Sequence, residues 1–274
     1  MKTKEITVSL SGVIPIAAYE NLRPGFSITV EPIDGETDEQ IINDKLQELH
    51  QIFELEANRG KADLLRKLYA NIRWYEKDGK QYPSVTSVLT LCGGQNGKEK
   101  DFHITDDELA QYAARGNAIE AVVEYYLKTG TWPEPPEMVV AYEDIAILTN
   151  GSLKFSWADC SHKAFMETYG PKIKAERFQT TVFNEEHLYA GTSDIVGEFD
   201  GVRSLMDIKS GGYDMRQLAA YAVCEQDIKQ LVILLVGPTD NKCGYKKPVI
   251  CDTIQTEFEA FLNARARFKQ RFGI

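Results

Sequence analysis

Apolar and polar residues alternate on both sides of Asp200-Gly201, and this is the clearest pattern in the chain. An Asp-Gly pair between alternating segments predicts a β-hairpin with a two-residue turn. Such a turn fixes the register of the strands that it joins. The predicted facing pairs are Phe199 with Val202, Gly197 with Ser204, and Asp194 with Asp207.

The last of these pairs brings two carboxylates together. Facing Cβ atoms in a hairpin lie about 4.5–5.5 Å apart, and like charges at that distance repel. The period of two also places Lys209 on the same side of its strand as Asp207. A divalent cation between Asp194 and Asp207 would remove the repulsion, because hard cations such as Mg²⁺ bind carboxylate oxygens. A surface hairpin held by salt bridges explains the pattern equally well, since the acidic-x-Lys triplet recurs elsewhere in polar turns and at a helix end.

The N-terminal pattern predicts two strands and then helix. Strands are expected at residues 5–16 and 26–32, around a turn at 21–25. A capping box at Thr37-Asp-Glu-Gln40 predicts the start of a helix. The apolar spacing resumes after Asn58-Arg59-Gly60, which indicates a second long helix.

The remaining patterns predict an α/β chain from residue 80 onward. A helix is expected to begin at Ser84-Val85-Thr86, and Gly191 is expected to allow a tight bend before Asp194. Further strands are predicted from Lys174, at 231–236 and at 248–254, and helices from Thr105, at 215–225 and at 256–272. We therefore divide the chain into an N-terminal β-β-α accessory segment, residues 1–79, and a core, residues 80–274. The accessory segment is expected to be an accessory domain, a contact surface for a partner, a cap packed on the core, or a homo-oligomer interface.

Composition changes this picture in three respects. The net charge of −10 over 274 residues argues against a simple basic nucleic-acid binder, although a local basic groove remains compatible with it. The five cysteines form no CxxC pair, so we expect reduced thiols and no zinc site. No stretch is long enough to span a membrane, so a cytoplasmic protein without membrane contact is expected.

Three segments together resemble the PD-(D/E)xK nuclease superfamily, above all its RecB-like and phage or mitochondrial exonuclease branch. The first is Gly191-Thr-Ser-Asp194 followed by Asp207-Ile208-Lys209 and then Gln217-x-x-x-Tyr221. The second is Tyr82-Pro-Ser-Val-Thr-Ser-Val-Leu89, similar to the YPSVTxxL opening of that branch. The third runs from Ala114-Arg115-Gly116 to Glu124, similar to its RGxxxHxxxE helix. The resemblance covers roughly residues 80 to 260.

The resemblance implies a restriction-endonuclease-like core, with a mixed central sheet flanked by helices. It implies Mg²⁺ or Mn²⁺ held by Asp194, Asp207 and the carbonyl of Ile208. The implied catalytic set is Asp194, Asp207, Lys209, Gln217 and Tyr221. Lys209 would orient or deprotonate the attacking water, whereas Gln217 and Tyr221 would position the nucleic-acid strand. From the residues alone, Tyr221 is equally compatible with the buried side of its helix.

Three glutamates are added by the same resemblance. Glu120 stands where relatives usually carry His, so it either replaces that His as a metal ligand or marks a lost role. Glu124 and Glu176 correspond to supporting acidic residues. By spacing alone, Glu120 and Glu124 form a pair one helical turn apart, which is more often a solvated face. The cysteine-ligated iron–sulfur cluster of some relatives is not expected, because their clustered C-terminal cysteines are missing.

The function expected is metal-dependent exonuclease activity on single- or double-stranded DNA ends, in phage or bacterial recombination and repair. An endonuclease of the same superfamily is the main alternative. A non-catalytic DNA- or protein-binding module, or an assembly protein in which the acidic hairpin is accidental, are two others. The basic residues of the last predicted helix, Arg265, Arg267, Lys269 and Arg271, are expected either to contact phosphates or to lie in solvent.

Overall fold

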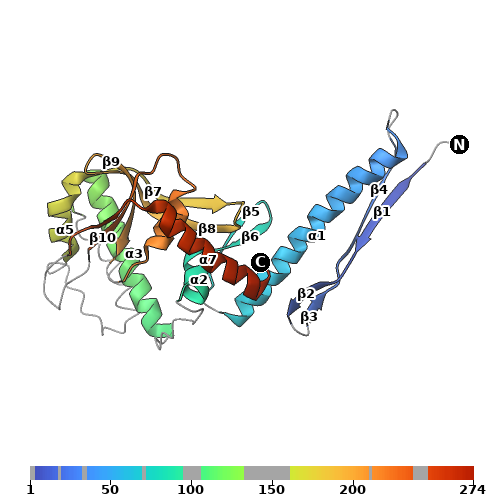
Figure 1. Ribbon diagram of the computed structural model, residues 1–274, viewed down its shortest axis with the longest axis horizontal. Helices are drawn as coiled ribbons and strands as arrows, with labels where there is room; N and C mark the ends of the chain where they lie inside the picture. The colour runs from blue at the N-terminus through green and yellow to red at the C-terminus, as the bar shows by residue number, and fades with distance from the viewer. Residues whose placement is uncertain are drawn as a thin grey trace.

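A computed structural model describes residues 4–17, 20–32, 36–69, 72–94, 106–132, 161–209, 212–236 and 246–274. Within these residues the protein is mixed α/β, with one five-stranded central sheet, three two-stranded sheets and six α-helices. Figure 1 shows a body built around the central sheet and an arm that projects from it. No helix in the described ranges is long and apolar enough to cross a membrane.

The central sheet has the strand order β11-β10-β9-β8-β7. Its strands are β7 (Ile173–Asn184), β8 (Tyr189–Phe199), β9 (Val202–Lys209), β10 (Gln230–Leu235) and β11 (Val249–Cys251). Neighbouring strands are antiparallel except β9 and β10, which are parallel. A parallel pair needs a crossover, and α6 (Met215–Ala222) lies in that connection.

The hairpin predicted at Asp200-Gly201 is confirmed. Both turn residues have positive φ, 53° at Asp200 and 79° at Gly201, as a type I′ turn requires. Phe199 pairs with Val202 and Gly197 with Ser204, in the predicted register. The pairing of β8 with β9 ends at Ile195 and Met206. Asp194 and Asp207 therefore lie one position beyond the last pair, where the two strands separate.

Helices cover both faces of this sheet, because successive side chains of a strand point to opposite faces. On one face Leu205, Leu231 and Ile233 pack with α2 (Val85–Cys92), α6 and α7 (Ile254–Phe272). On the other face Met206 and Val232 pack with α3 (Asp106–Thr129) and α5 (Ser161–Tyr169). The 3₁₀-helix η3 (Gly170–Lys172) joins α5 to β7.

The arm consists of a ribbon and one long helix. Its strands are β1 (Ile6–Ser11), β2 (Ile14–Ala17), β3 (Glu20–Leu22) and β4 (Gly25–Val30). The pairs Ile6–Val30 and Ile14–Leu22 belong to one register, and the N–H of Gly12 donates to the Pro24 carbonyl between them. The turn predicted at 21–25 is therefore wrong, because β3 occupies 20–22 and pairs with β2.

A single helix, α1 (Asp38–Leu68), replaces the two that the pattern predicted. The capping box is confirmed, because the N–H of Gln40 donates to Thr37 Oγ1 at 3.3 Å and the N–H of Thr37 donates to Gln40 Oε1 at 3.0 Å. Gly60 does not break the helix. A Cβ on Gly60 would fall 2.1 Å from Leu22 Cδ1, so this glycine makes room for the β2–β3 end of the ribbon.

α1 connects two apolar clusters. Near its start, Ile41 and Leu49 pack with Ile6 and Val8 of the ribbon. Near its end, Ala62 and Leu65 belong to the main core of the body. The predicted division at 79/80 falls in the turn between β5 (Trp74–Lys77) and β6 (Lys80–Pro83), so it would cut a hairpin. The division into domains stays a prediction.

Other element boundaries agree with their predictions only in part. Ser84 is the N-cap of α2, and its side chain accepts a hydrogen bond from the N–H of Ser87 at 3.0 Å. α6 begins at Met215 as predicted and ends at Ala222, earlier than the predicted 225. β11 is shorter than the strand predicted at 248–254. Thr105, the predicted cap of α3, lies outside the described residues.

Candidate functional site

Asp194 and Asp207 are both buried where β8 and β9 separate. Their side chains are 7% and 1% exposed. The N–H of Ile208 donates to Asp194 Oδ2 at 2.8 Å, so the carboxylate of one strand is held by the backbone of the other. The hairpin register and this hydrogen bond together fix Asp194 beside the segment Asp207-Ile208-Lys209.

The electrostatics of Asp194 show the repulsion that the sequence predicted. Burial raises the pKa of Asp194 to about 8, together with the negative charges of Asp207 and Glu120. The positive charge of Lys209 and the hydrogen bond from Ile208 act in the opposite direction without cancelling the rise. With no cation present, burial and the neighbouring carboxylates therefore favour the protonated form of Asp194.

Lys209 lies against Asp207. Its Nζ is 2.5 Å from Asp207 Oδ2, an ion pair by distance. The same oxygen is fully buried and has no partner with hydrogen-bond geometry among the described residues. Burial lowers the pKa of Lys209, but the charges of Asp207 and Asp194 outweigh it and raise the pKa above its ordinary value. The positive form of Lys209 is thus favoured by its ion pair with Asp207.

Glu120, on α3, is a third carboxylate in the same electrostatic field. The pKa of Glu120 is raised above its ordinary value, mainly by burial. The positive charge of Lys209 opposes this rise, and the negative charge of Asp207 adds to it. Within the described ranges, however, no three His, Cys, Asp or Glu side chains are grouped so that they could hold a metal ion. The structure therefore leaves the role of Glu120 as a ligand a prediction.

The donor chemistry of the pair fits Mg²⁺ or Mn²⁺. Magnesium usually keeps several waters and is bound through one or two carboxylates, so a third side chain is not required. Asp207 Oδ2 is buried with Lys209 as its ion-pair partner, and burial together with the charges of Asp207 and Glu120 raises the pKa of Asp194, an effect that a bound cation would oppose. The carbonyl of Ile208 follows Asp207 directly in the chain and is the further oxygen that the resemblance implies.

Tyr221 and Gln217 of α6 lie next to this pair. Tyr221 is 3% exposed and belongs to the main core, as the alternative interpretation of its helix predicted. Burial raises the pKa of its hydroxyl, and the charge of Asp207 contributes in the same direction, so the ring is core while its hydroxyl lies in the field of the acidic pair. Gln217 Nε2 donates to that hydroxyl at 3.2 Å.

Gly191 has a different role from the one predicted. It is not among the residues of positive φ, so no special backbone bend explains it. Instead, an added Cβ would fall 2.1 Å from Cε1 of Tyr221. The glycine therefore allows β8 to lie directly on the Tyr221 ring.

The structure also brings together segments that are distant in sequence. Ser84 forms a parallel β-bridge with Ala190, immediately before Gly191. Tyr75 Oη and Thr192 Oγ1 are 3.1 Å apart. The segment that begins at Tyr82 and the segment that ends at Asp194 are thus neighbours in space, on the same side of the hairpin as α6.

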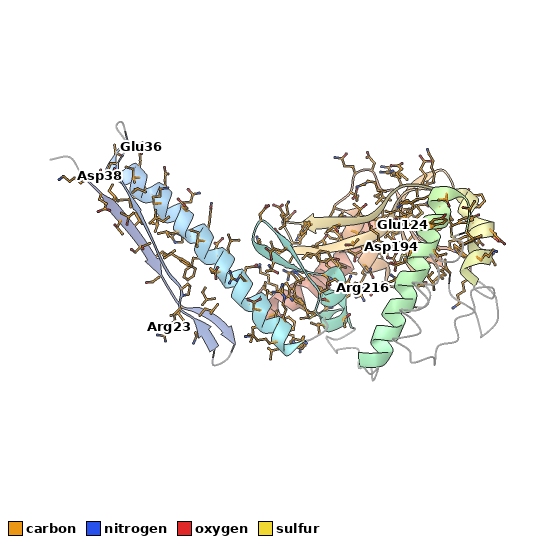
Figure 2. All side chains as sticks on the ribbon, turned by 180° about the vertical axis from the view of Figure 1, so that it is seen from behind. Arg23, Glu36, Asp38, Glu124, Asp194 and Arg216 are labelled. Carbon is orange, nitrogen blue, oxygen red and sulfur yellow. The ribbon has the colours of Figure 1, made fainter. Side chains whose placement is uncertain are left out.

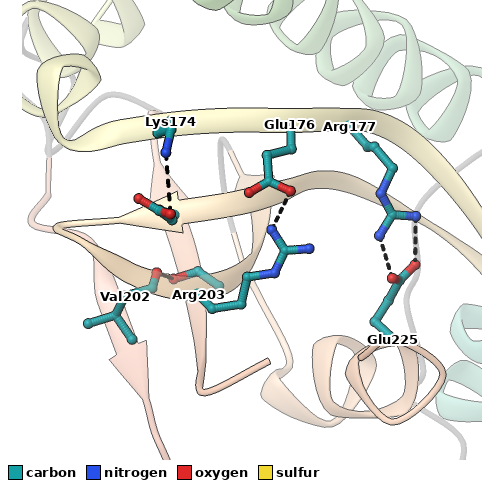
Figure 3. A network of polar contacts seen from close by, with 8 residues as sticks. Lys174, Glu176, Arg177, Val202, Arg203 and Glu225 are labelled. Carbon is teal, nitrogen blue, oxygen red and sulfur yellow. Dashed lines mark hydrogen bonds and ion pairs between the residues drawn. The ribbon is translucent and has the colours of Figure 1, made fainter. Parts of the chain in front are cut away.

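Glu124 and Glu176 are engaged in other contacts. Glu124, labelled in Figure 2, forms an ion pair with Lys128 one helical turn further along α3. Glu176 Oε2 is 2.5 Å from Arg203 Nη1, as Figure 3 shows. A β-bulge between Ala175 and Arg177 contains Glu176. The structure gives both glutamates ion pairs and, among the described contacts, none with Asp194 or Asp207.

Two arginines, Arg73 and Arg265, have interactions that the sequence did not predict. Arg73, before β5, lowers the pKa of Glu120 by its charge, and its N–H donates to Ser87 Oγ at 2.9 Å. It lies outside the segments of the resemblance, so no motif pointed to it. Arg265, expected near phosphate or solvent, is only 4% exposed and donates to the carbonyls of His187, Leu188 and Ile274. For Arg265 that expectation is wrong.

A cavity of about 220 Å³ lies between α2 and α7, and its lining includes Leu91, Cys92 and Arg267. Arg267 donates to the carbonyl of Cys92 at 2.7 Å. None of the residues around the acidic pair lines this cavity.

Neither a protein-family model nor a curated protein matches the chain. The resemblance to a nuclease superfamily therefore rests on the short sequence segments quoted above.

Proposed function

We propose that this protein is a metal-dependent deoxyribonuclease of the PD-(D/E)xK type, acting as an exonuclease in phage or bacterial recombination and repair. The observation that carries the proposal is the buried pair of Asp194 and Asp207 beside Lys209. A fold selected for stability alone gains nothing from two buried carboxylates that repel each other. A hard cation compensates both charges.

Phosphodiester hydrolysis needs an activated water and compensation of the charge on the phosphate. Mg²⁺ or Mn²⁺ held by Asp194, Asp207 and the Ile208 carbonyl would lower the pKa of a water and neutralise phosphate charge. Asp194 must lose its proton before it can act as a ligand, so cation affinity rises as pH approaches about 8.

The raised pKa of Lys209 bears on its role. A lysine that acts as a general base needs a pKa lowered toward neutrality. The charges around Lys209 shift its pKa the other way. A cation bound by Asp194 and Asp207 would oppose this shift, so we assign Lys209 to stabilising negative charge on the phosphate and to orienting or deprotonating the attacking water.

Gln217 and Tyr221 support the substrate side of the pair. Tyr221 is buried and neutral, so its hydroxyl serves as a hydrogen-bonding group and not as a base. Gln217 is half-buried and holds that hydroxyl through Nε2. Its carbonyl oxygen remains for a nucleotide, which fits the strand-positioning role implied by the resemblance.

The fold also favours the proposal. A mixed sheet with helices on both faces is the architecture that the resemblance implies. The arm, residues 1–68, carries twelve acidic and eight basic residues, so −6 of the net charge of −10 lies in residues 69–274. Binding of DNA by the body therefore depends on a local basic surface and not on its overall charge.

The test is degradation of linear and closed circular DNA with Mg²⁺ or Mn²⁺, comparing wild type with Lys209→Ala. Lys229→Ala, at an exposed lysine just before β10, is the matched control. We expect metal-dependent loss of linear DNA only, retained in Lys229→Ala and abolished in Lys209→Ala. Intact DNA under every metal condition would refute the nuclease assignment.

The alternatives predict different results in the same experiment. An endonuclease cuts circular DNA, which has no end. A non-catalytic binding module retards DNA in a gel without shortening it, and Lys209→Ala then changes no product. The exonuclease proposal fails in either case.

A further inference from the structure

Among the described residues, β1 and β4 of the arm's ribbon pair only with each other. Each outer edge therefore presents backbone N–H and C=O groups without a strand partner in this part of the chain. Proteins usually protect such edges with Lys, Pro or a bulge, because an exposed edge pairs readily with another chain. β1 and β4, with sequences ITVSLS and GFSITV, contain neither Lys nor Pro, and their pairing has no bulge.

The register shows which backbone groups point outward. Gly12 N–H donates to the Pro24 carbonyl, and in an antiparallel pair hydrogen-bonded and non-hydrogen-bonded positions alternate. Thr7 with Thr29, and Ser9 with Ser27, are then non-hydrogen-bonded pairs. The 2.9 Å contact between the Thr7 and Thr29 hydroxyls fits the closer spacing of such pairs. Their own N–H groups point away from the ribbon, toward its two edges.

The side chains leave these edges accessible. Thr7, Ser9, Ser27 and Thr29 are exposed and small, whereas the alternate apolar residues of both strands pack toward α1. α1 thus covers one face of the ribbon, and no described strand pairs with either outer edge of β1 and β4.

Charge selects the kind of partner. Glu5 and Glu31 lie one residue beyond the paired Ile6 and Val30, at the open end of the ribbon. Glu36 and Asp38 lie at the same far end of the arm, as Figure 2 shows. Residues 1–56, which hold the ribbon and the first part of α1, carry eleven acidic and four basic residues, so this part of the arm repels DNA and a second copy of itself and attracts a basic chain.

We propose that one edge of this ribbon binds a basic, extended segment of a partner protein as an added β-strand. Main-chain hydrogen bonds to the outward groups of β1 or β4 would supply the register, and carboxylates at the open end would select lysine and arginine. The proposal is independent of the nuclease activity, because none of its residues belongs to the acidic pair.

The experiment measures fluorescence anisotropy of a labelled ten-residue peptide of alternating Lys and Val against the full chain. A peptide of alternating Glu and Val, and the Lys–Val peptide with a central Pro, are the matched probes. We expect the Lys–Val peptide to bind at least about tenfold more tightly than either. Glu31→Lys, which leaves the backbone unchanged, is expected to weaken binding and to reduce its dependence on salt.

Ser9→Pro and Ser27→Pro each remove one outward N–H and no hydrogen bond within the ribbon, with Ser9→Ala and Ser27→Ala as controls. We expect one of the two Pro variants to lose binding by about tenfold or more, with unchanged circular dichroism, and both Ala variants to bind normally.

Four results would overturn the proposal. The first two are failure of wild type to bind the Lys–Val peptide and equal binding of the Glu–Val peptide. The third is self-association in solution that a Pro variant removes, since the edge then belongs to a second copy. The fourth is binding of a DNA duplex that the same variant removes.

Discussion

Gly191 and Tyr221 are in such close contact that a Cβ on Gly191 would fall 2.1 Å from Cε1 and 2.7 Å from Cζ of the ring. The ring is buried in the main core and cannot move aside freely. Through this contact, the segment that leads to Asp194 packs directly against α6, the helix that also contains Gln217.

Gly191→Ala is expected to destabilise the protein by about 1–3 kcal/mol through overpacking. Backbone strain contributes nothing, because Gly191 has no positive φ. Urea unfolding measures the change. Gly212→Ala is the control, since an added Cβ there has no atom within 4 Å.

A double-variant cycle with Tyr221→Ala identifies the cause. If the ring is the obstacle, Gly191→Ala costs much less in the Tyr221→Ala background than in wild type. Equal costs in both backgrounds would contradict the contact.

Asp194→Asn is expected to change how stability depends on pH in the absence of divalent cations. The folded-state pKa of about 8 lies above the unfolded value, so the folded protein binds more protons between about pH 4 and pH 8. Wild-type stability therefore falls as pH rises through this window, by an amount on the order of a few kcal/mol. The Asn variant lacks this decline and is the more stable protein at pH 9.

Chemical unfolding in EDTA at pH 5, 7 and 9 measures both slopes. Asp78→Asn, in the exposed β5–β6 turn, is the matched control and should keep the wild-type slope. A wild-type protein whose stability is the same at pH 5 and pH 9 would show that Asp194 is not buried as a neutral acid.

Divalent cations are expected to stabilise the protein through the acidic pair. At a free Mg²⁺ or Mn²⁺ concentration tenfold above Kd, binding to the folded state alone contributes about 1.4 kcal/mol, a shift of a few degrees in Tm. Asp207→Asn should abolish the shift. Asp200→Asn, at the exposed hairpin turn, should retain it, and an equal shift in both variants would place the cation elsewhere.

Glu120 and Glu176 are expected to differ in their effect on nuclease activity. Glu120 lies in the field of Asp207 and Lys209, whereas Glu176 is paired with Arg203. Glu120→Gln should lower kcat/KM for linear DNA by about tenfold or more, and Glu176→Gln should leave it within about twofold. A larger loss of kcat/KM in Glu176→Gln than in Glu120→Gln would instead favour the supporting role that the resemblance implies for Glu176.

Arg265→Met is expected to destabilise the protein by several kcal/mol, because three carbonyl groups lose their buried donor. Burial lowers the pKa of Arg265 to about 10, yet it stays charged at neutral pH. Lys269→Met, exposed on the same helix, is the control. In thermal unfolding, the Tm of Arg265→Met should be clearly lower than that of Lys269→Met. A similar Tm for the two variants would contradict a structural role of Arg265.

Local chemistry explains what the sequence predicted well. The Asp200-Gly201 turn depends on two residues of positive φ, and it sets the register up to Ile195 and Met206 without help from distant contacts. The caps at Thr37 and Ser84 are equally local. The turn and its register are sufficient to predict, from the amino-acid sequence alone, that Asp194 lies beside Asp207.

Features that depend on distant contacts were predicted poorly. From the local sequence, Gly60 indicates a helix break. Its actual role depends on Leu22, which lies 38 positions away in the sequence and packs against it. The bulge between Ala175 and Arg177 re-aims Glu176, and nothing in the local sequence indicates it. The charge of Arg73 acts on the pKa of Glu120 although 47 positions separate them in the sequence, so only the folded chain brings the two into range.

The continuity of α1 has a mechanical consequence. A helix of 31 residues spans roughly 46 Å, and its two ends are anchored in different apolar clusters. A flexible linker of that length would let its ends take any separation up to its full reach. The helix instead holds anything bound to the ribbon at one distance and in one orientation from the central sheet. Shortening α1 by two residues would turn the ribbon by about 200° around the helix axis. The length of the helix therefore sets the direction in which the ribbon, and any segment bound to it, faces relative to the central sheet.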